Sequence, residues 1–274
     1  MDFVFDPNFD ATQDVDYWKY WWTPEKGDEL LGSRHGVDPD SQSKKLHEYH
    51  KTLWSKKLPC GKNWDLISKR GKGYYFTWND GIADRNYSSD SLLNSFRWRG
   101  LKPLLEQVKN HIEEDLKLDY HKWLEDYIRK LYTMGGMIIF PTRRGSINII
   151  RAFTKVNDRV DLTFECIRRF YIGEKSPMTK CLEKDKPFFD LFGEKEKGFK
   201  EYVDFFLLQD IVSDDYKHVK NLLGSKEYCD DFFKTKGEVT IPQNVEEYMQ
   251  WYDNLIDFAE KRNKRIAEWI KNQE

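Results

Sequence analysis

The chain has 274 residues, 34% of them charged and 16% aromatic, and its formal net charge is -2. The aromatic content excludes a disordered chain, and the charge balance excludes a strongly basic protein that coats nucleic acid by charge alone. No apolar run approaches the roughly 20 residues that cross a bilayer, so we expect no membrane partner. The four cysteines form no CxxC pair and the acidic start resembles no export signal, which predicts reduced thiols and a cytoplasmic location.

The first 40 residues predict an irregular segment that wraps the rest of the protein. Aromatic residues are concentrated in this segment, among them Tyr17, Trp18, Trp21 and Trp22. Such side chains either pack into the protein's own core or form a surface for a protein partner. The sequence leaves both interpretations open.

Residues 41–140 predict a half of mixed helices and strands. A helix is expected after Asp40 or Ser41, either of which can cap it, because apolar residues then recur at helical spacing as far as Trp54. Residues 64–67 and 73–78 predict two strands, which a glycine-containing turn separates.

The rest of this half predicts three helices and one buried strand. Residues 88–91, with three serines and one aspartate, are expected to cap a short helix. Pro103 suits the first turn of a second helix, where its missing N–H is not needed. Apolar residues at helical spacing over 123–131 predict the third helix, and the apolar run 137–140, between Gly-Gly and a proline, predicts a buried strand.

Residues 141–274 predict a helical half. Helices are expected from Asn157 or Asp158 to Tyr171, over residues 177–192 and 199–212, in a short piece after Ser213, and from Asn244 to near the end of the chain. The whole pattern predicts an α+β fold. We expect one mostly α-helical domain over residues 1–274, with a few short strands in the N-terminal half and a long C-terminal helix.

Positive charge is concentrated in the middle of the chain. Seven basic residues but only three acidic ones lie between Arg143 and Arg169, a local excess of four. Arg143 and Arg144 follow the predicted strand in a glycine-containing loop, where backbone N–H groups and guanidinium groups can both reach phosphate oxygens. The sequence therefore predicts a site for a phosphate-bearing ligand or nucleic acid. Its expected residues are Arg143, Arg144, Asn148, Arg151, Arg168 and Arg169.

A second interpretation explains these arginines by local ion pairs, without a ligand site. Arg159, Arg168 and Arg169 can instead pair with the nearby acidic residues Asp158, Asp161 and Glu165 on a solvated helix. These arginines would then be neutralised locally, and the sequence cannot choose between the two interpretations.

An enzyme is the main alternative to a binding protein. In that case His50, Asp90, Asn148 and Arg151 would converge in one polar pocket, which requires the fold to bring distant residues together. No cofactor is expected, because the chain contains neither GxxxxGK[ST] nor GxGxxG. No metal is expected either, because the histidines and aspartates near the start of the chain lack a known ligand spacing. These residues are His35, Asp38, Asp40, His47 and His50.

Several stretches resemble a family of uncharacterised bacterial proteins with no established function. The stretches are residues 49–56, 58–59, 88–91, 135–141, 158–169, 202–210 and 262–266. The resemblance spans most of the chain and implies a bacterial or phage source and a single domain. It implies no activity, cofactor or site residue.

Overall fold

The computed structural model describes residues 5–18, 38–94, 96, 101–142, 147–234 and 239–273. Its architecture is α+β, as the sequence predicts, with a small sheet in the N-terminal half and a long helix near the C-terminus. Trp21, Trp22, His35, Arg143 and Arg144 lie outside the described residues. Within the part of the chain that the structure describes, no helix combines the length and apolar character needed to cross a membrane.

Four antiparallel strands form one sheet in chain order. They are β1 (Ile67–Arg70), β2 (Tyr74–Asn79), β3 (Asp84–Ser91) and β4 (Met137–Pro141). The predicted strand at residues 64–67 begins only at Ile67, because Trp64 turns inward and packs edge-on against Tyr87. β4 is buried along its whole length, as its apolar run predicts.

The helix cap predicted at residues 88–91 is wrong. These residues form the end of β3, where Ser89 pairs with Ile139 and Ser91 pairs with Met137 of β4. Alternation along the strand buries the side chains of Ser89 and Ser91, whereas Ser88 and Asp90 are less buried and project to the other face. Pairing with β4 gives backbone groups of this segment partners in the sheet, which a short capped helix would not do.

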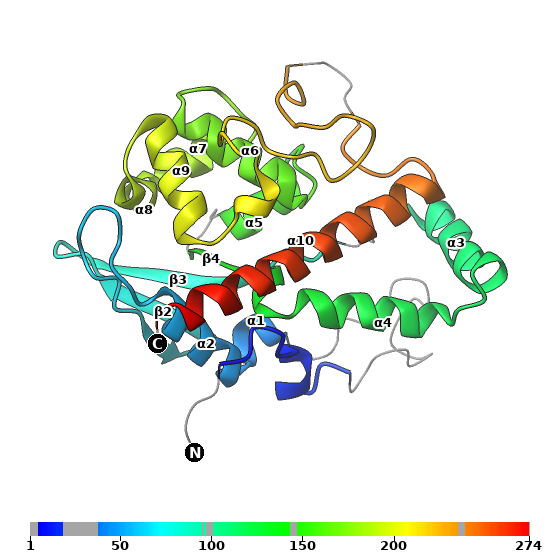
Figure 1. Ribbon diagram of the computed structural model, residues 1–274, viewed down its shortest axis with the longest axis horizontal. Coiled ribbons are helices and arrows are strands. Elements are labelled where there is room, and N and C mark those ends of the chain that lie inside the picture. The colour runs from blue at the N-terminus through cyan, green and yellow to red at the C-terminus, as the bar shows by residue number, and fades with distance from the viewer. Residues whose placement is uncertain are drawn as a thin grey trace.

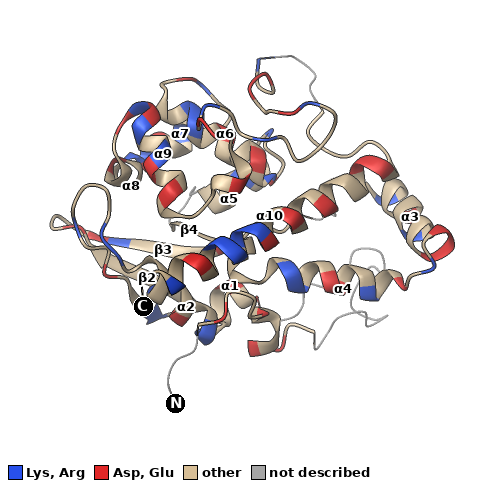
Figure 2. Ribbon diagram, viewed as in Figure 1, with Lys and Arg blue, Asp and Glu red and all other residues tan. Residues whose placement is uncertain are grey.

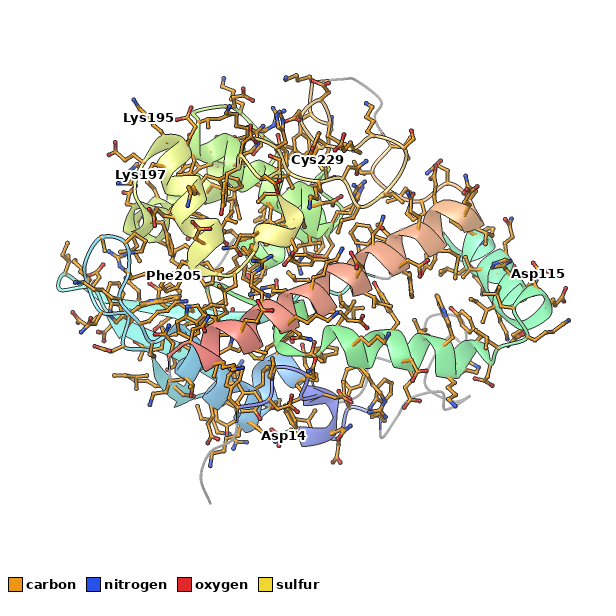
Figure 3. All side chains as sticks on the ribbon, viewed as in Figure 1. Asp14, Asp115, Lys195, Lys197, Phe205 and Cys229 are labelled. Atoms are coloured by element: carbon orange, nitrogen blue, oxygen red, sulfur yellow. The ribbon has the colours of Figure 1, made fainter. Side chains whose placement is uncertain are left out.

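Ten α-helices are described. They are α1 (Pro39–Gln42), α2 (Lys44–Trp54), α3 (Lys102–Asn110), α4 (Tyr120–Leu131), α5 (Ile147–Phe153), α6 (Val160–Tyr171), α7 (Thr179–Lys184), α8 (Lys186–Phe189), α9 (Lys195–Phe205) and α10 (Val245–Lys271). In Figure 1, α10 runs diagonally across the molecule, with α5 to α9 grouped on one side and α2 and α4 on the other. Figure 2 shows positive and negative positions mixed along α4 and α10. Figure 3 shows Lys195 and Lys197 on the outer side of the α5–α9 group and Phe205 on the side toward the sheet.

Several helix boundaries differ from the sequence prediction. Ser43 rather than Asp40 or Ser41 caps α2, by accepting a bond from the N–H of Leu46. The helix predicted over residues 177–192 is divided into α7, α8 and a 3-10 turn, and Pro187 lies at the start of α8. The helix predicted over residues 199–212 ends at Phe205. After Ser213 the chain forms β-bridges instead of a helix.

The long helix α10 begins at Val245, directly after Asn244, where the sequence predicts a helix start. The Asn244 side chain caps the helix by accepting a bond from the N–H of Glu247. Its centre is attached to the segment that leads into β4. Fully buried Arg262 donates to the carbonyls of Met137 (2.6 Å), Gly135 (3.0 Å) and Phe206 (3.0 Å). Burial lowers the pKa of Arg262 to about 9. This one side chain therefore joins α10, the start of β4 and the end of α9.

Candidate functional site

Polar side chains of β3 and α5 meet on one face of the sheet. Asn148 Nδ2 donates to Ser88 Oγ over 3.3 Å, and Arg151 Nε lies 3.2 Å from Asp90 Oδ2. Residues two apart in a strand share a face, and residues three apart in a helix do so as well. The fold therefore brings together three of the four residues that the enzyme hypothesis groups: Asp90, Asn148 and Arg151.

His50 lies on the opposite face of β3. Its Nε2 is 2.9 Å from Ser89 Oγ, and Trp54 Nε1 donates to its Nδ1 over 3.0 Å. Because Nδ1 accepts this bond, we assign the imidazole proton to Nε2, which donates to Ser89. Burial, together with the nearby His47 and Arg262, holds the pKa of His50 well below its usual value, so the ring is neutral. The pleat of β3 separates His50 from the other three residues.

Arg151 is the single guanidinium in a group of three carboxylates, which we call the Arg151 cluster: Asp40, Asp90, Arg151 and Asp158. Arg151 Nε lies 3.1 Å from Asp158 Oδ1, and its Nη2 donates to the carbonyl of Ser91 over 2.6 Å. Asp40 Oδ2 accepts a 2.9 Å bond from the N–H of Ser91. The guanidinium is 2% exposed, so the cluster has more negative than positive groups in a poorly solvated place.

Burial and this excess of negative groups raise the pKa values of two carboxyl groups of the cluster. Burial, then the charges of Asp38 and Asp90, raise the pKa of Asp40 well above its usual range. Burial raises the pKa of Asp90 to about 7, although Arg151 opposes the shift. Asp40 Oδ1 is buried and accepts no hydrogen bond from the described residues, and the buried Asp90 Oδ2 has the Arg151 guanidinium 3.2 Å away. A buried carboxylate in this situation takes up a proton more readily than one in water.

Two consecutive residues in the left-handed region connect this cluster to a groove. Asn157 has φ +52° and Asp158 has φ +62°, so the helix predicted to start at one of them begins only at Val160. Each such non-glycine residue costs on the order of 1 kcal/mol. The conformation is held by Asn94 Nδ2, which donates to the Asn157 carbonyl over 2.8 Å, and by the Asp158 N–H, which donates to the Arg151 carbonyl over 2.9 Å.

The groove has a volume of about 940 Å³ and contains both rings and cations. Three phenylalanines line it, Phe153 from the end of α5 and Phe232 with Phe233 from the loop before α10. Lys155 and Lys175 are its charged residues, and among the described residues that line it there is no Asp or Glu. The remaining lining residues are Thr154, Asn157, Ser176, Pro177 and Thr240.

Arg168 and Arg169 of α6, and Arg159 directly before it, are already paired. Glu165, which is fully buried, accepts bonds from Arg168 Nε (2.8 Å) and Arg169 Nε (2.6 Å). Asp161 similarly accepts a 3.0 Å bond from Arg159 Nε. The pairing that the sequence offers as an alternative is therefore present for these three residues, although α6 is buried rather than solvated.

These paired arginines support the aromatic wall. The Arg159 guanidinium lies 5.0 Å from the ring centroid of Phe232, and that of Arg169 lies 5.5 Å from the centroid of Phe233. Arg169 also pairs with Glu174 at 3.3 Å. Arg159 and Arg169 therefore position phenylalanines of the groove wall, whereas Arg151 belongs to the neighbouring cluster.

Sequence reasoning missed Lys175 and the two phenylalanines Phe232 and Phe233. Lys175 stands in a Gly-Glu-Lys-Ser-Pro turn that predicts only the end of a helix, and the phenylalanines stand between charged residues with no helical spacing. Of the two groove lysines, only Lys155 is indicated by the sequence, because it belongs to the basic stretch between Arg143 and Arg169.

The N-terminal aromatics that the structure describes pack on the chain itself. Tyr17 is 8% exposed and its ring lies 5.3 Å from that of Tyr132. Trp18 Nε1 donates to Thr12 Oγ1 over 3.1 Å, and the Arg129 guanidinium lies 4.7 Å from the Trp18 ring. Core packing therefore accounts for these two side chains.

Across residues 5–18, 38–94, 96, 101–142, 147–234 and 239–273, no group of three or more His, Cys, Asp or Glu side chains is arranged to hold a metal ion.

The comparison with curated proteins gives no match, and neither does the comparison with solved structures. A family of unknown function matches residues 5–266, which is nearly the whole chain. The chain therefore belongs to this family, DUF6994.

Proposed function

We propose that the protein binds a phosphate-bearing ligand in the groove beside the Arg151 cluster. The observation that carries the proposal is the pair of exposed lysines, Lys155 and Lys175, on a groove whose described lining has no carboxylate. Lysine is a compact point charge that suits phosphate oxygens. The volume of about 940 Å³ lies within the usual range for small-molecule sites.

The basic stretch of the chain contributes to this site in two ways. Arg159 and Arg169 support the groove wall from behind, while Lys155 offers its charge to the ligand. Arg143 and Arg144 remain part of the proposal on sequence grounds, because they precede α5, whose last residue Phe153 lines the groove.

The proposal also places the protein in the cytoplasm of a bacterium. The four cysteines are thiols rather than disulfides, and Cys166, Cys181 and Cys229 are buried. Cys229 lies near α6 (Figure 3), with its Sγ 4.0 Å from Asp161 Oδ2. Burial of these thiols in reduced form suits a reducing compartment.

Replacing both groove lysines tests the function. We expect Lys155→Ala with Lys175→Ala to weaken pyrophosphate binding roughly ten-fold, because each exposed charge contributes up to about 1 kcal/mol. Isothermal titration calorimetry at about 50 mM and about 200 mM salt should show weaker binding at the higher salt, since exposed charges are screened.

The control variant is Lys44→Ala on α2, an exposed lysine whose partner Glu48 lies 3.8 Å away. It should leave the affinity unchanged. A wild-type protein that binds no pyrophosphate, or an equal loss in Lys44→Ala, contradicts the proposal.

A further inference from the structure

We infer that the ligand of the groove is a mononucleotide, whose base stacks on Phe153 while its phosphate meets the two lysines. This inference rests on the proposed function. Phe153 is 80% exposed although it is a large apolar ring at the end of a helix. A ring in water that faces a groove is the feature that core packing does not explain, and every nucleobase offers a flat face to such a ring.

The apolar surface around Phe153 is larger than one side chain. Ile149, one turn earlier on α5, is 47% exposed, and Phe233 forms another part of the groove wall. A phosphate alone would gain nothing from these groups. A ligand with both an anionic end and an apolar, flat end uses the lysines and the rings together.

The aromatic wall is held in place before any ligand arrives. Phe232 and Phe233 rest against Arg159 and Arg169, and each of these arginines is fixed by a fully buried carboxylate, Asp161 or Glu165. Preorganised groups lose little conformational entropy on binding. The polar groups of the same groove, Thr154, Asn157, Ser176 and Thr240, can accept or donate to the edge of a base or to a ribose.

A single nucleotide fits the charges better than a polymer does. The described lining of the groove offers two lysines, and the whole chain has a net charge of -2. A polynucleotide tract needs a basic track that neutralises several successive phosphates. One nucleotide needs only a local pair of cations.

The test compares AMP, ribose 5-phosphate and inorganic phosphate by calorimetry on the full chain at low salt. We expect AMP to bind roughly ten-fold or more tightly than ribose 5-phosphate, the range that one base stacked on an aromatic ring provides. Phe153→Ala should remove this advantage and leave ribose 5-phosphate binding unchanged, while Phe153→Trp should keep it. Because the ring is exposed, these variants should fold normally, as circular dichroism will show.

The matched control is Ile82→Ala, which removes an 87% exposed apolar side chain at the turn between β2 and β3. It should change nothing. Equal affinities for AMP and ribose 5-phosphate would overturn the nucleotide inference and leave the phosphate proposal standing. Binding of none of the three ligands would overturn both. An adenylate oligonucleotide that binds far more tightly than AMP, with a steep salt dependence, would overturn the mononucleotide class.

Discussion

Replacing Arg151 by methionine is expected to destabilise the fold by about 3–5 kcal/mol at pH 8, the usual consequence of removing one partner from a buried ion pair. The substitution leaves Asp90 and Asp158 without the guanidinium that lies 3.2 and 3.1 Å from them. It also removes the donor to the Ser91 carbonyl. Unfolding in urea, followed by tryptophan fluorescence, measures the loss.

An exposed arginine with two carboxylate partners provides the control, because it tests whether the large loss depends on burial of the ion pair. Arg129→Met removes a guanidinium that is 31% exposed and also pairs with two carboxylates, those of Asp10 and Glu125. It should cost about 1 kcal/mol or less, since exposed ion pairs contribute little. Similar losses of unfolding free energy in both variants would show that burial does not make the Arg151 ion pairs more costly to break than exposed ones.

Asp90→Asn should stabilise the protein at pH 8 and leave its stability nearly unchanged at pH 4. Burial raises the pKa of Asp90 to about 7 in the folded protein, from 3.8 in the unfolded chain. A raised carboxyl pKa contributes stability that is present below about pH 4 and is lost as pH rises through 7. The groups that face Asp90 are Arg151, which opposes this shift, Asp158 and Asp38, which add to it, and Asp40, whose own pKa the Asp90 charge raises.

The measurement is the pH profile of the urea midpoint for the wild type, for Asp90→Asn and for its combination with Arg151→Met. We expect the gain from Asp90→Asn to be larger in the Arg151→Met background, because one unpaired charge is then removed. A gain that is greatest at pH 4, or a loss at pH 8, would contradict the linkage.

Gly135→Ala is expected to have the second large effect, about 3 kcal/mol or more, because overpacking against backbone cannot relax. A Cβ at Gly135 would lie 2.0 Å from the carbonyl oxygen of Ala259 and 2.8 Å from Asn263 Oδ1. Asn263 Oδ1 also accepts a 2.6 Å bond from the Gly135 N–H. The alanine would therefore push α10 away from the start of β4, and thermal unfolding should show a strongly lowered midpoint.

Gly71→Ala provides the matched control. There a Cβ would meet only Tyr75 Cε1 at 3.5 Å, an ordinary contact. Its unfolding midpoint should stay close to that of the wild type. If Gly135→Ala unfolds at the wild-type temperature, the close approach of α10 is not as tight as described.

The elements that the sequence predicted well are those with a local cause. The stripe from Leu46 to Trp54 gave α2, and the Asn244 cap with its following stripe gave α10. β4 followed from an apolar run between glycines and a proline. In each case the hydrophobic period or the turn residues lie within the element itself.

The wrong predictions concern residues whose structure depends on contacts with parts of the chain that are far away in sequence. Ser88–Ser91 could have capped a helix, but pairing with β4, whose residues follow about 50 positions later, fixes this segment as strand. The groove draws Phe153 and Phe233 from positions 80 apart, and no local pattern marks either of them. The enzyme hypothesis groups His50 with Asp90 and Arg151, and the structure brings only the last two together. Which face of β3 a distant residue meets depends on tertiary packing, and the sequence carries no signal for it.

The buried side chain of Arg262 has a consequence for how the protein is made. The carbonyls of Gly135 and Met137 are satisfied by a donor that stands more than 120 positions later in the chain. On the ribosome, the strands emerge before Arg262 has been translated, so these acceptors stay open until α10 follows. The segment that leads into β4 therefore gains these hydrogen bonds only once α10 has been synthesised.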